Sequence, residues 1–183
     1  MWSGPRNIST ALMRSFENRS DTFITDEPFY AHYLQQTGTD HPMWEEVLKS
    51  GNPKWDEVAE YLTGAIPNGK SVWYQKHMAQ HNLPGADLTW TEKLANCFLI
   101  RDPGEVILSY SKKYEITSIY QLGYPQQVLL FNHLKNKNEA NVIVLDSKDI
   151  LQNPKILLKL LCKELGIPFS DKMFCWPPGK RDS

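Results

Sequence analysis

The chain has few cysteines and no excess of charge of either sign. Its three cysteines, Cys97, Cys162 and Cys175, include no C-x-x-C pair, so neither a disulfide framework nor a cysteine zinc site is indicated. Twenty Lys and Arg residues against 21 Asp and Glu residues leave a net charge of −1, which argues against nucleic acid or an anionic membrane as a partner. The sequence predicts a cytoplasmic protein in which any anion site is local.

Long apolar runs are also missing. The most apolar stretch, 156–162, is interrupted by Lys159 and is shorter than the roughly 20 residues that a membrane span needs. The start of the chain lacks the basic and apolar segments of a signal peptide. With 183 residues, 41% of them hydrophobic, the chain is long enough to bury a core of its own. We expect a single domain over residues 1–183.

Short β-branched or aromatic runs alternate with longer helical patterns. This alternation predicts an α/β fold with a mostly parallel sheet flanked by helices. The clearest boundary is Asp102, a capping carboxylate followed by Pro103 at the first helical position. The expected strands are 22–25, 72–76, 97–101 and 142–145. The expected helices are 9–17, 28–36, 43–50, 55–62, 103–113, 125–135 and 154–165.

The N-terminal run Ser3-Gly4-Pro5-Arg6-Asn7-Ile8-Ser9-Thr10 opens directly into a helical pattern. A loop entering a helix presents unpaired backbone N–H groups and the positive end of the helix dipole, and both favour a phosphate. Arg6 adds a fixed charge, and Ser9 and Thr10 add hydroxyl donors. The run has no lysine and does not match a Walker A loop. The plainer interpretation is that Ser9 or Thr10 caps the helix and Arg6 lies on the surface.

A second segment pairs Arg101 with Ser109. Arg101 ends an expected strand, and Ser109 lies eight residues later, about two helical turns past the cap. Both side chains face one ligand if the helix packs beside the strand. The alternative is that Arg101 pairs with Glu105 and that Ser109 bonds back to its own helix.

Together these segments resemble the sulfotransferase family. Residues 5–10 are similar to its 5′-phosphosulfate loop, commonly P-[KR]-S-G-[ST]-T, and Arg101 with Ser109 matches its 3′-phosphate pair. Residues 144–154 and the L-G-I-P-F run at 165–169 are also similar to family segments, so the resemblance covers most of the chain. A closer resemblance is to bacterial and plant sulfotransferase-like proteins with an S-G-P-R-N-[IV]-S-T loop and a D-E-P-[FL]-Y-A-H-Y-L segment.

The resemblance implies a three-layer P-loop NTPase-like fold. It also implies transfer of a sulfuryl group from 3′-phosphoadenosine 5′-phosphosulfate (PAPS) to a hydroxyl or amine of a small-molecule acceptor, without a metal. Two other functions stay open: a binding module for adenosine bisphosphate without turnover, and a P-loop phosphotransferase, against which the missing Walker lysine weighs. The donor-binding residues that the resemblance implies are Pro5, Arg6, Asn7, Ile8, Ser9, Thr10, Arg101 and Ser109.

The sequence departs from the family pattern in the loop and at both ends. Asn7 replaces the usual serine and Ile8 the usual glycine, so we expect that residue 8 cannot take a glycine-only conformation and that the loop geometry is altered. Only Met1 and Trp2 precede Ser3, so we expect the first strand to be lacking. The closing element G-x-x-G-x-W-[KR] is also expected to be lacking, apart from a beginning at 179–183.

Three residues are candidates for the chemistry. Arg6 would stabilise charge on the bridging oxygen. For the base, Glu27 corresponds to the glutamate of the tyrosylprotein sulfotransferase branch, and His77 lies where the cytosolic branch carries its K-T-H histidine. Histidine is the easier base at neutral pH, whereas glutamate needs burial to approach that range, and the sequence does not decide between them. The plainer interpretations are that Glu27 caps a helix and that His77 is a hydrogen-bonded edge residue.

The acceptor is expected near Glu27, because Tyr30, His32 and Tyr33 follow it directly. Lys76 either contacts the sulfonate or faces solvent. His77 and His81 form an H-x-x-x-H pair, but the glutamate of a zinc motif and a third ligand are missing, so we expect no metal.

Overall fold

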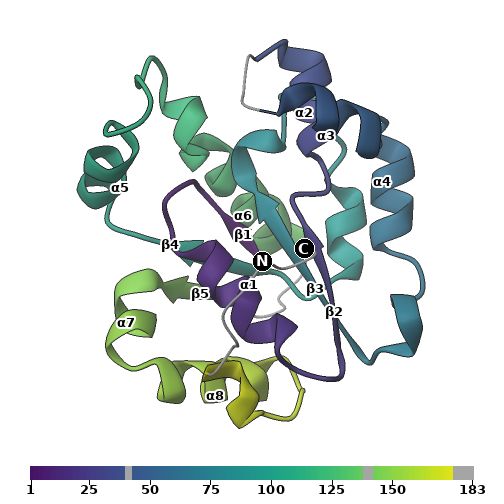
Figure 1. Ribbon diagram of the computed structural model, residues 1–183, viewed down its shortest axis with the longest axis vertical. Coiled ribbons are helices and arrows are strands. Elements are labelled where there is room, and N and C mark those ends of the chain that lie inside the picture. The colour runs from purple at the N-terminus through teal and green to yellow at the C-terminus, as the bar shows by residue number, and fades with distance from the viewer. Residues whose placement is uncertain (40–42, 138–141, 175–183) are drawn as a thin grey trace.

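The computed structural model describes residues 1–39, 43–137 and 142–174. Within them, five strands form one sheet in the order β2-β3-β1-β4-β5, and all four neighbouring pairs are parallel (Figure 1). The strands are β1 (Trp2–Ser3), β2 (Thr22–Asp26), β3 (Val72–Met78), β4 (Cys97–Ile100) and β5 (Ile143–Asp146). This confirms the predicted α/β fold with a parallel sheet.

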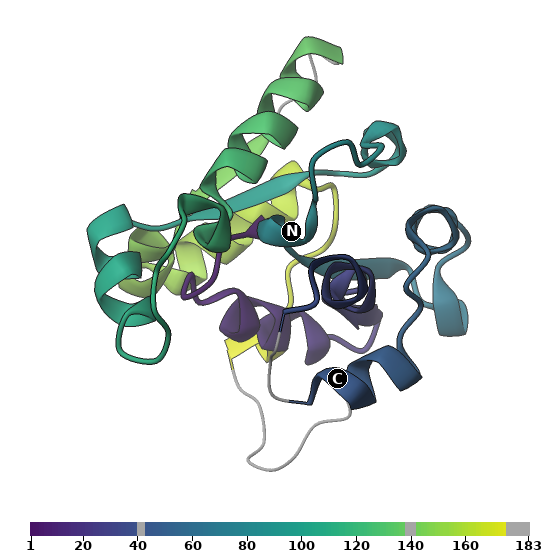
Figure 2. The ribbon, with the colours of Figure 1, turned by 90° about the horizontal axis from the view of Figure 1, so that it is seen from above.

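Helices cover both faces of the sheet, and α1 and α6 lie on opposite faces (Figure 2). The α-helices are α1 (Ser9–Glu17), α2 (Tyr30–Thr37), α3 (Trp44–Ser50), α4 (Trp55–Leu62), α5 (Pro103–Tyr110), α6 (Tyr124–Lys137), α7 (Ser147–Gln152) and α8 (Pro154–Glu164). Short 3-10 turns are η1 (Pro67–Gly69), η2 (Ala79–His81), η3 (Thr89–Lys93), η4 (Ile119–Leu122) and η5 (Asp171–Phe174). No helix in the described ranges is long and apolar enough to cross a membrane.

The element ends agree with the sequence pattern to within two residues, with one exception. The helix expected over 103–113 ends at Tyr110, because the chain then tightens into a turn in which the Lys113 N–H donates to the Tyr110 carbonyl. Its start is confirmed, since the Asp102 carboxylate accepts from the Glu105 N–H at 3.0 Å. The segment after β5 forms the short helix α7, capped by Asp146.

The strand β1 is only two residues long, yet it occupies the centre of the sheet between β3 and β4. Trp2 is 2% exposed and Ser3 is fully buried, and the Trp2 indole N–H donates to Asn96 Oδ1 at 2.8 Å. The central position is therefore filled by Trp2 and Ser3. The C-terminal element expected to begin at 179–183 lies outside the described residues.

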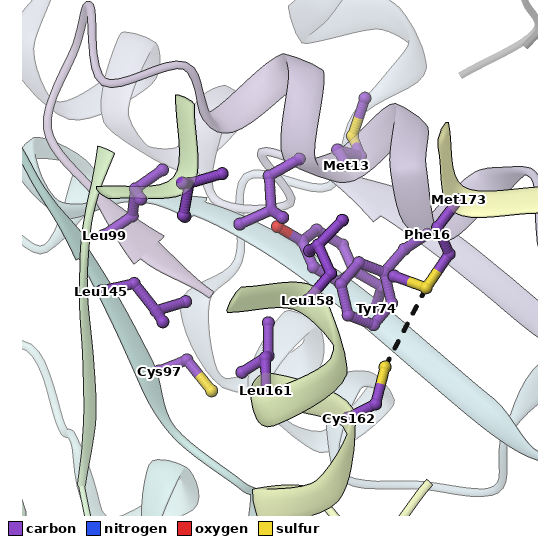
Figure 3. Packing of buried hydrophobic residues seen from close by; sticks show 12 residues of the cluster. Met13, Phe16, Tyr74, Cys97, Leu99, Leu145, Leu158, Leu161, Cys162 and Met173 are labelled. Carbon is purple, nitrogen blue, oxygen red and sulfur yellow. Dashed lines mark hydrogen bonds between the residues drawn. The ribbon is translucent and has the colours of Figure 1, made fainter. Parts of the chain in front are cut away.

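One face of the sheet is covered by α1 and α8. Apolar side chains from these helices meet those of the strands, and Figure 3 shows them converging over the sheet. The helical members include Leu12, Met13, Phe16, Leu158, Leu161 and Cys162, and the sheet members are Tyr74, Cys97, Leu99 and Leu145.

The other face carries a more aromatic cluster. Phe29 stacks on Trp55 with ring centroids 3.9 Å apart, and Trp2 stacks on His77 at 4.2 Å. Leu130 and Leu134 of α6 close this cluster together with residues of α4. The sheet is thus the middle of three layers, with an apolar core on each side.

The helix α8 offers a matched test of the first core. Leu158 is 3% exposed inside the cluster, whereas Leu160, on the same helix, is 49% exposed. We expect Leu158→Ala to lower the free energy of unfolding by about 2 to 5 kcal/mol, because it removes buried methyl groups and leaves a cavity. Leu160→Ala should change it by less than about 1 kcal/mol. Urea unfolding followed by circular dichroism measures both, and similar losses would contradict the packing described.

Candidate donor loop and acceptor cleft

Four segments at the candidate site follow the end of a strand, and Lys76 and His77 lie near the end of β3 itself. The loop Gly4–Ile8 follows β1, Glu27 follows β2, the turn η2 follows β3 and Arg101 follows β4. Because the strands are parallel, these segments meet at the carboxyl edge of the sheet, where open α/β folds bind their ligands.

The loop before α1 exposes backbone N–H groups. Ile8 is the N-cap of α1, and no side chain caps the helix, so the first N–H groups lack partners within it. Arg6 (φ 63°) and Ile8 (φ 54°) are both left-handed, a pattern that turns neighbouring N–H groups into an anion-binding concavity. Ser9 and Thr10 start the helix without capping it, so the plainer interpretation of these two residues is wrong.

The expectation that the backbone of Ile8 cannot take a conformation typical of glycine is wrong. Ile8 adopts φ 54° and ψ 14°, a conformation in which a residue with a Cβ is strained by about 1 to 2 kcal/mol. Its side chain packs against the first core cluster, and the neighbouring Asn7 is 1% exposed with its Nδ2 donating to the Leu99 carbonyl at 3.1 Å. Both contacts fix the path of the loop. The Asn7 side chain points into the core, so only its backbone is available to an anion.

The structure brings Arg6, Arg101 and Ser109 together. Arg6 Nε donates to Ser109 Oγ at 2.9 Å, and Arg101 Nη1 donates to the Arg6 carbonyl at 2.8 Å. Arg101 Nε also pairs with Glu105 at 2.9 Å, so that part of the alternative interpretation is correct, whereas Ser109 bonds to the loop instead of its own helix. Two guanidinium groups, a hydroxyl and a helix N-terminus thus lie at one place, an arrangement suited to an anion with several charges.

Lys76, near the end of β3, carries a buried ammonium group. Lys76, 3% exposed, donates to Asp26 Oδ1 at 2.7 Å and to Glu27 Oε1 at 2.5 Å. Burial alone would lower the pKa of Lys76, but the two carboxylates outweigh it and raise the pKa above its usual value. Lys76 is therefore a charged anchor for two carboxylates and does not face solvent.

A cleft of about 680 Å³ opens in front of these carboxylates. Pro5 and Arg6 of the loop form one wall, and Asp26 and Glu27 with residues of α2 and α3 form another. The cleft also contains four tyrosines, Tyr30, Tyr33, Tyr110 and Tyr114. Donor-loop and acceptor candidates thus share one open space.

The family model for the sulfotransferase domain matches residues 1–183. The chain belongs to the sulfotransferase domain family. Its fold is similar to the sulfotransferase domain of the curacin biosynthetic pathway (TM-score 0.56, 14% identity) and to that of the Synechococcus PCC 7002 olefin synthase (TM-score 0.60, 13% identity). Each alignment covers 94% of this chain and 74% of the other.

The curated relatives are much longer. The branched-chain-amino-acid aminotransferase-like proteins 2 and 1 of Arabidopsis thaliana are 31% and 32% identical to this sulfotransferase domain over 97% of its length. The chain spans 31% and 32% of those two proteins, about a third of each.

Among the base and acceptor residues proposed from sequence, Glu27, Tyr30 and Tyr33 line the cleft of the sulfotransferase domain, whereas His77, His32 and Lys76 do not. His77 is 3% exposed in the aromatic core, where burial holds its pKa well below the usual value. His32 is turned aside as well, with Nδ1 at 2.8 Å from the Pro53 carbonyl and its ring against Trp55. In a strand, neighbouring side chains point to opposite faces, so Lys76 reaches the carboxylates while His77 enters the core.

Sequence reasoning missed several cleft residues of the sulfotransferase domain, among them Asp26, His81, Tyr110 and Tyr114. His81 was weighed only as a metal ligand, but it stacks on Tyr30 at 5.1 Å and its Nε2 lies 4.0 Å from Glu27 Oε2. Its position just past β3 was a usable signal, because that strand ends at the same edge as β2. Tyr110 and Tyr114 follow Ser109 closely, and they line the cleft from the last residue of α5 and from the turn after it.

The H-x-x-x-H pair is not on a helix, since His77 is in β3 and His81 in η2. Among the residues that the structure describes, no group of three or more His, Cys, Asp or Glu side chains could hold a metal ion.

The strain at Ile8 can be measured with two small replacements. Both Ile8→Gly and Ile8→Ala remove the packed side chain, but only glycine relieves the left-handed conformation. We expect the glycine variant to be more stable than the alanine variant by about 1 kcal/mol, the reverse of the usual order. Chemical unfolding of the two proteins gives the difference. A more stable alanine variant would show that residue 8 is not left-handed in solution.

Proposed function

We propose that this protein is a PAPS-dependent sulfotransferase that acts on a hydroxyl or amine of a small-molecule acceptor. The observation that carries this proposal is the meeting of Arg6, Arg101 and Ser109 at the N-terminus of α1, next to a cleft that contains Glu27. Family membership supports the transfer chemistry, and the arginines supply the charge that an anionic donor requires.

The residues present fit the two anionic ends of PAPS. The N–H groups before α1, with Ser9 and Thr10, would hold the 5′-phosphosulfate, and Arg101 with Ser109 would hold the 3′-phosphate. Binding requires the Ser109 hydroxyl to exchange its Arg6 partner for phosphate and Arg101 to share or leave Glu105. When bound, PAPS supplies an activated sulfuryl group and a phosphate leaving group.

Within the cleft, Glu27 is better placed than His77 to act as the base. Its Oε1 is held by Lys76, which fixes the orientation of the carboxylate, and its side chain is 29% exposed at the cleft wall. There it would take the proton of the acceptor hydroxyl or amine. Arg6, which also lines the cleft, would stabilise the negative charge that develops on the bridging oxygen.

Donor binding is tested by calorimetry with adenosine 3′,5′-bisphosphate. We expect it to bind at least about tenfold more tightly than ATP with magnesium, because Arg101 and Ser109 meet a 3′-phosphate that ATP lacks. Arg101→Ala should weaken binding by about tenfold or more, since one charge-assisted hydrogen bond is worth about 1.5 to 3 kcal/mol. Arg14→Ala, which removes an equal charge from the far end of α1, serves as the control. Equal affinity for ATP and for the bisphosphate would contradict the assignment of PAPS as the donor.

The base is tested by turnover with PAPS and a panel of alcohols, phenols and amines. Glu27→Gln should lower kcat by about 100-fold or more while the bisphosphate still binds, because the amide cannot accept the proton. His77→Phe keeps a ring in the aromatic core and should retain most of the turnover. If the two variants behaved the other way round, the base would have to be reassigned. A wild-type protein that bound the bisphosphate but turned over no acceptor would be a binding module.

A further inference from the structure

Four tyrosines from two distant segments meet in the acceptor cleft. Tyr30 and Tyr33 come from α2, and Tyr110 and Tyr114 come from the end of α5 and the turn after it. The rings of Tyr110 and Tyr114 lie 5.2 Å apart, and burial together with the nearby Glu27, Tyr114 and Tyr33 raises the pKa of Tyr30 to about 12. At neutral pH Tyr30 therefore presents a neutral ring and hydroxyl to whatever enters the cleft.

The wall beside these tyrosines carries an excess negative charge. Asp26 and Glu27, with side chains 33% and 29% exposed, share the single buried ammonium of Lys76. Two carboxylates against one ammonium leave one negative charge, and both carboxylates line the cleft.

Little in the cleft opposes that charge. Of the described residues that line it, only Arg6 and His81 are basic. Arg6 belongs to the donor loop and its Nε donates to Ser109 Oγ, so in the proposed function its charge is offset by the anionic donor. His81 Nε2 is 4.0 Å from Glu27 Oε2 and would balance the charge only when protonated.

We propose, resting on the function proposed above, that the acceptor is an organic cation, a phenol or alcohol that carries an ammonium group. The tyrosine rings would surround the cation and Asp26 would pair with it, while the acceptor hydroxyl lies near Glu27. Tyrosine faces attract an ammonium group through their quadrupole, and the carboxylate adds a Coulomb attraction. An acceptor with a carboxylate would instead meet a wall of its own sign.

Three phenols of similar size but different charge test the inference: tyramine, 4-propylphenol and 3-(4-hydroxyphenyl)propanoate. In PAPS turnover at pH 8, where ordinary histidines are neutral, we expect kcat/KM for tyramine to exceed that for 4-propylphenol by about tenfold or more. The propanoate should be the poorest acceptor. The preference for tyramine should shrink as salt rises, because part of the wall is open to solvent.

Variants identify the source of the preference. Asp26→Asn removes the excess charge and should bring the ratio of kcat/KM for tyramine to kcat/KM for 4-propylphenol to within about threefold of unity. The control is Asp149→Asn on α7, four strands away in the sheet order, which should not change this ratio. Tyr114→Leu should lower the ratio several-fold and Tyr114→Phe, which keeps the ring, should not. Equal use of the three phenols by an active enzyme would overturn the inference and leave sulfuryl transfer intact.

Direct binding separates the two proposals. If no phenol is turned over, binding in the cleft can still be measured. The protein is titrated by calorimetry with tyramine and with 4-propylphenol, each with and without adenosine 3′,5′-bisphosphate. Tighter binding of tyramine supports the cation site even where the bisphosphate fails to bind and the proposed function falls. Equal binding of the two phenols overturns the cation site whatever the nucleotide does.

Discussion

The buried ammonium of Lys76 is the interaction on which the acceptor cleft depends. Lys76 lies in β3, and its ammonium group pairs with two consecutive carboxylates at the end of β2, those of Asp26 and Glu27. It therefore connects the ends of two neighbouring strands. Taking a charge out of water is expensive, and removing one partner of such a group leaves the other uncompensated. The chain direction at Glu27, which is left-handed at φ 46°, follows from this attachment, because both its N–H and its carboxylate bind Lys76.

On the other side of the cleft, a backbone constraint takes the place of an ion pair. The loop before α1 is held by the burial of Asn7, by the packing of Ile8 and by the reach of Arg101 to the Arg6 carbonyl. Gly4 begins this path, where a Cβ atom would lie 2.5 Å from the Leu122 carbonyl oxygen. These contacts hold the backbone of the loop without any ligand, which supports the donor site proposed here.

Much of the fold could be predicted from sequence because it rests on local signals. Apolar strands, the cap at Asp102 and the alternation of elements indicate a parallel sheet whose carboxyl edge gathers the polar segments. The spacing of Arg101 and Ser109 allowed them to face one ligand, and the resemblance to the sulfotransferase family placed them with the loop. The placement of His77 could not be predicted, since adjacent strand residues point to opposite faces and the sequence does not say which face meets the ligand. The same applies to His32, and to Tyr110 and Tyr114, whose positions depend on where α5 ends.

The position of β1 has a consequence for the order of folding. Trp2 and Ser3 lie at the middle of the sheet, yet their partners on both sides, in β3 and β4, come much later in the chain. Bringing such distant segments together carries the entropy of closing large loops, whereas β2 and β3 need only one crossover. During synthesis β1 can therefore be paired on both sides only after β4 has been made, and the donor loop that follows β1 cannot take its final shape before then.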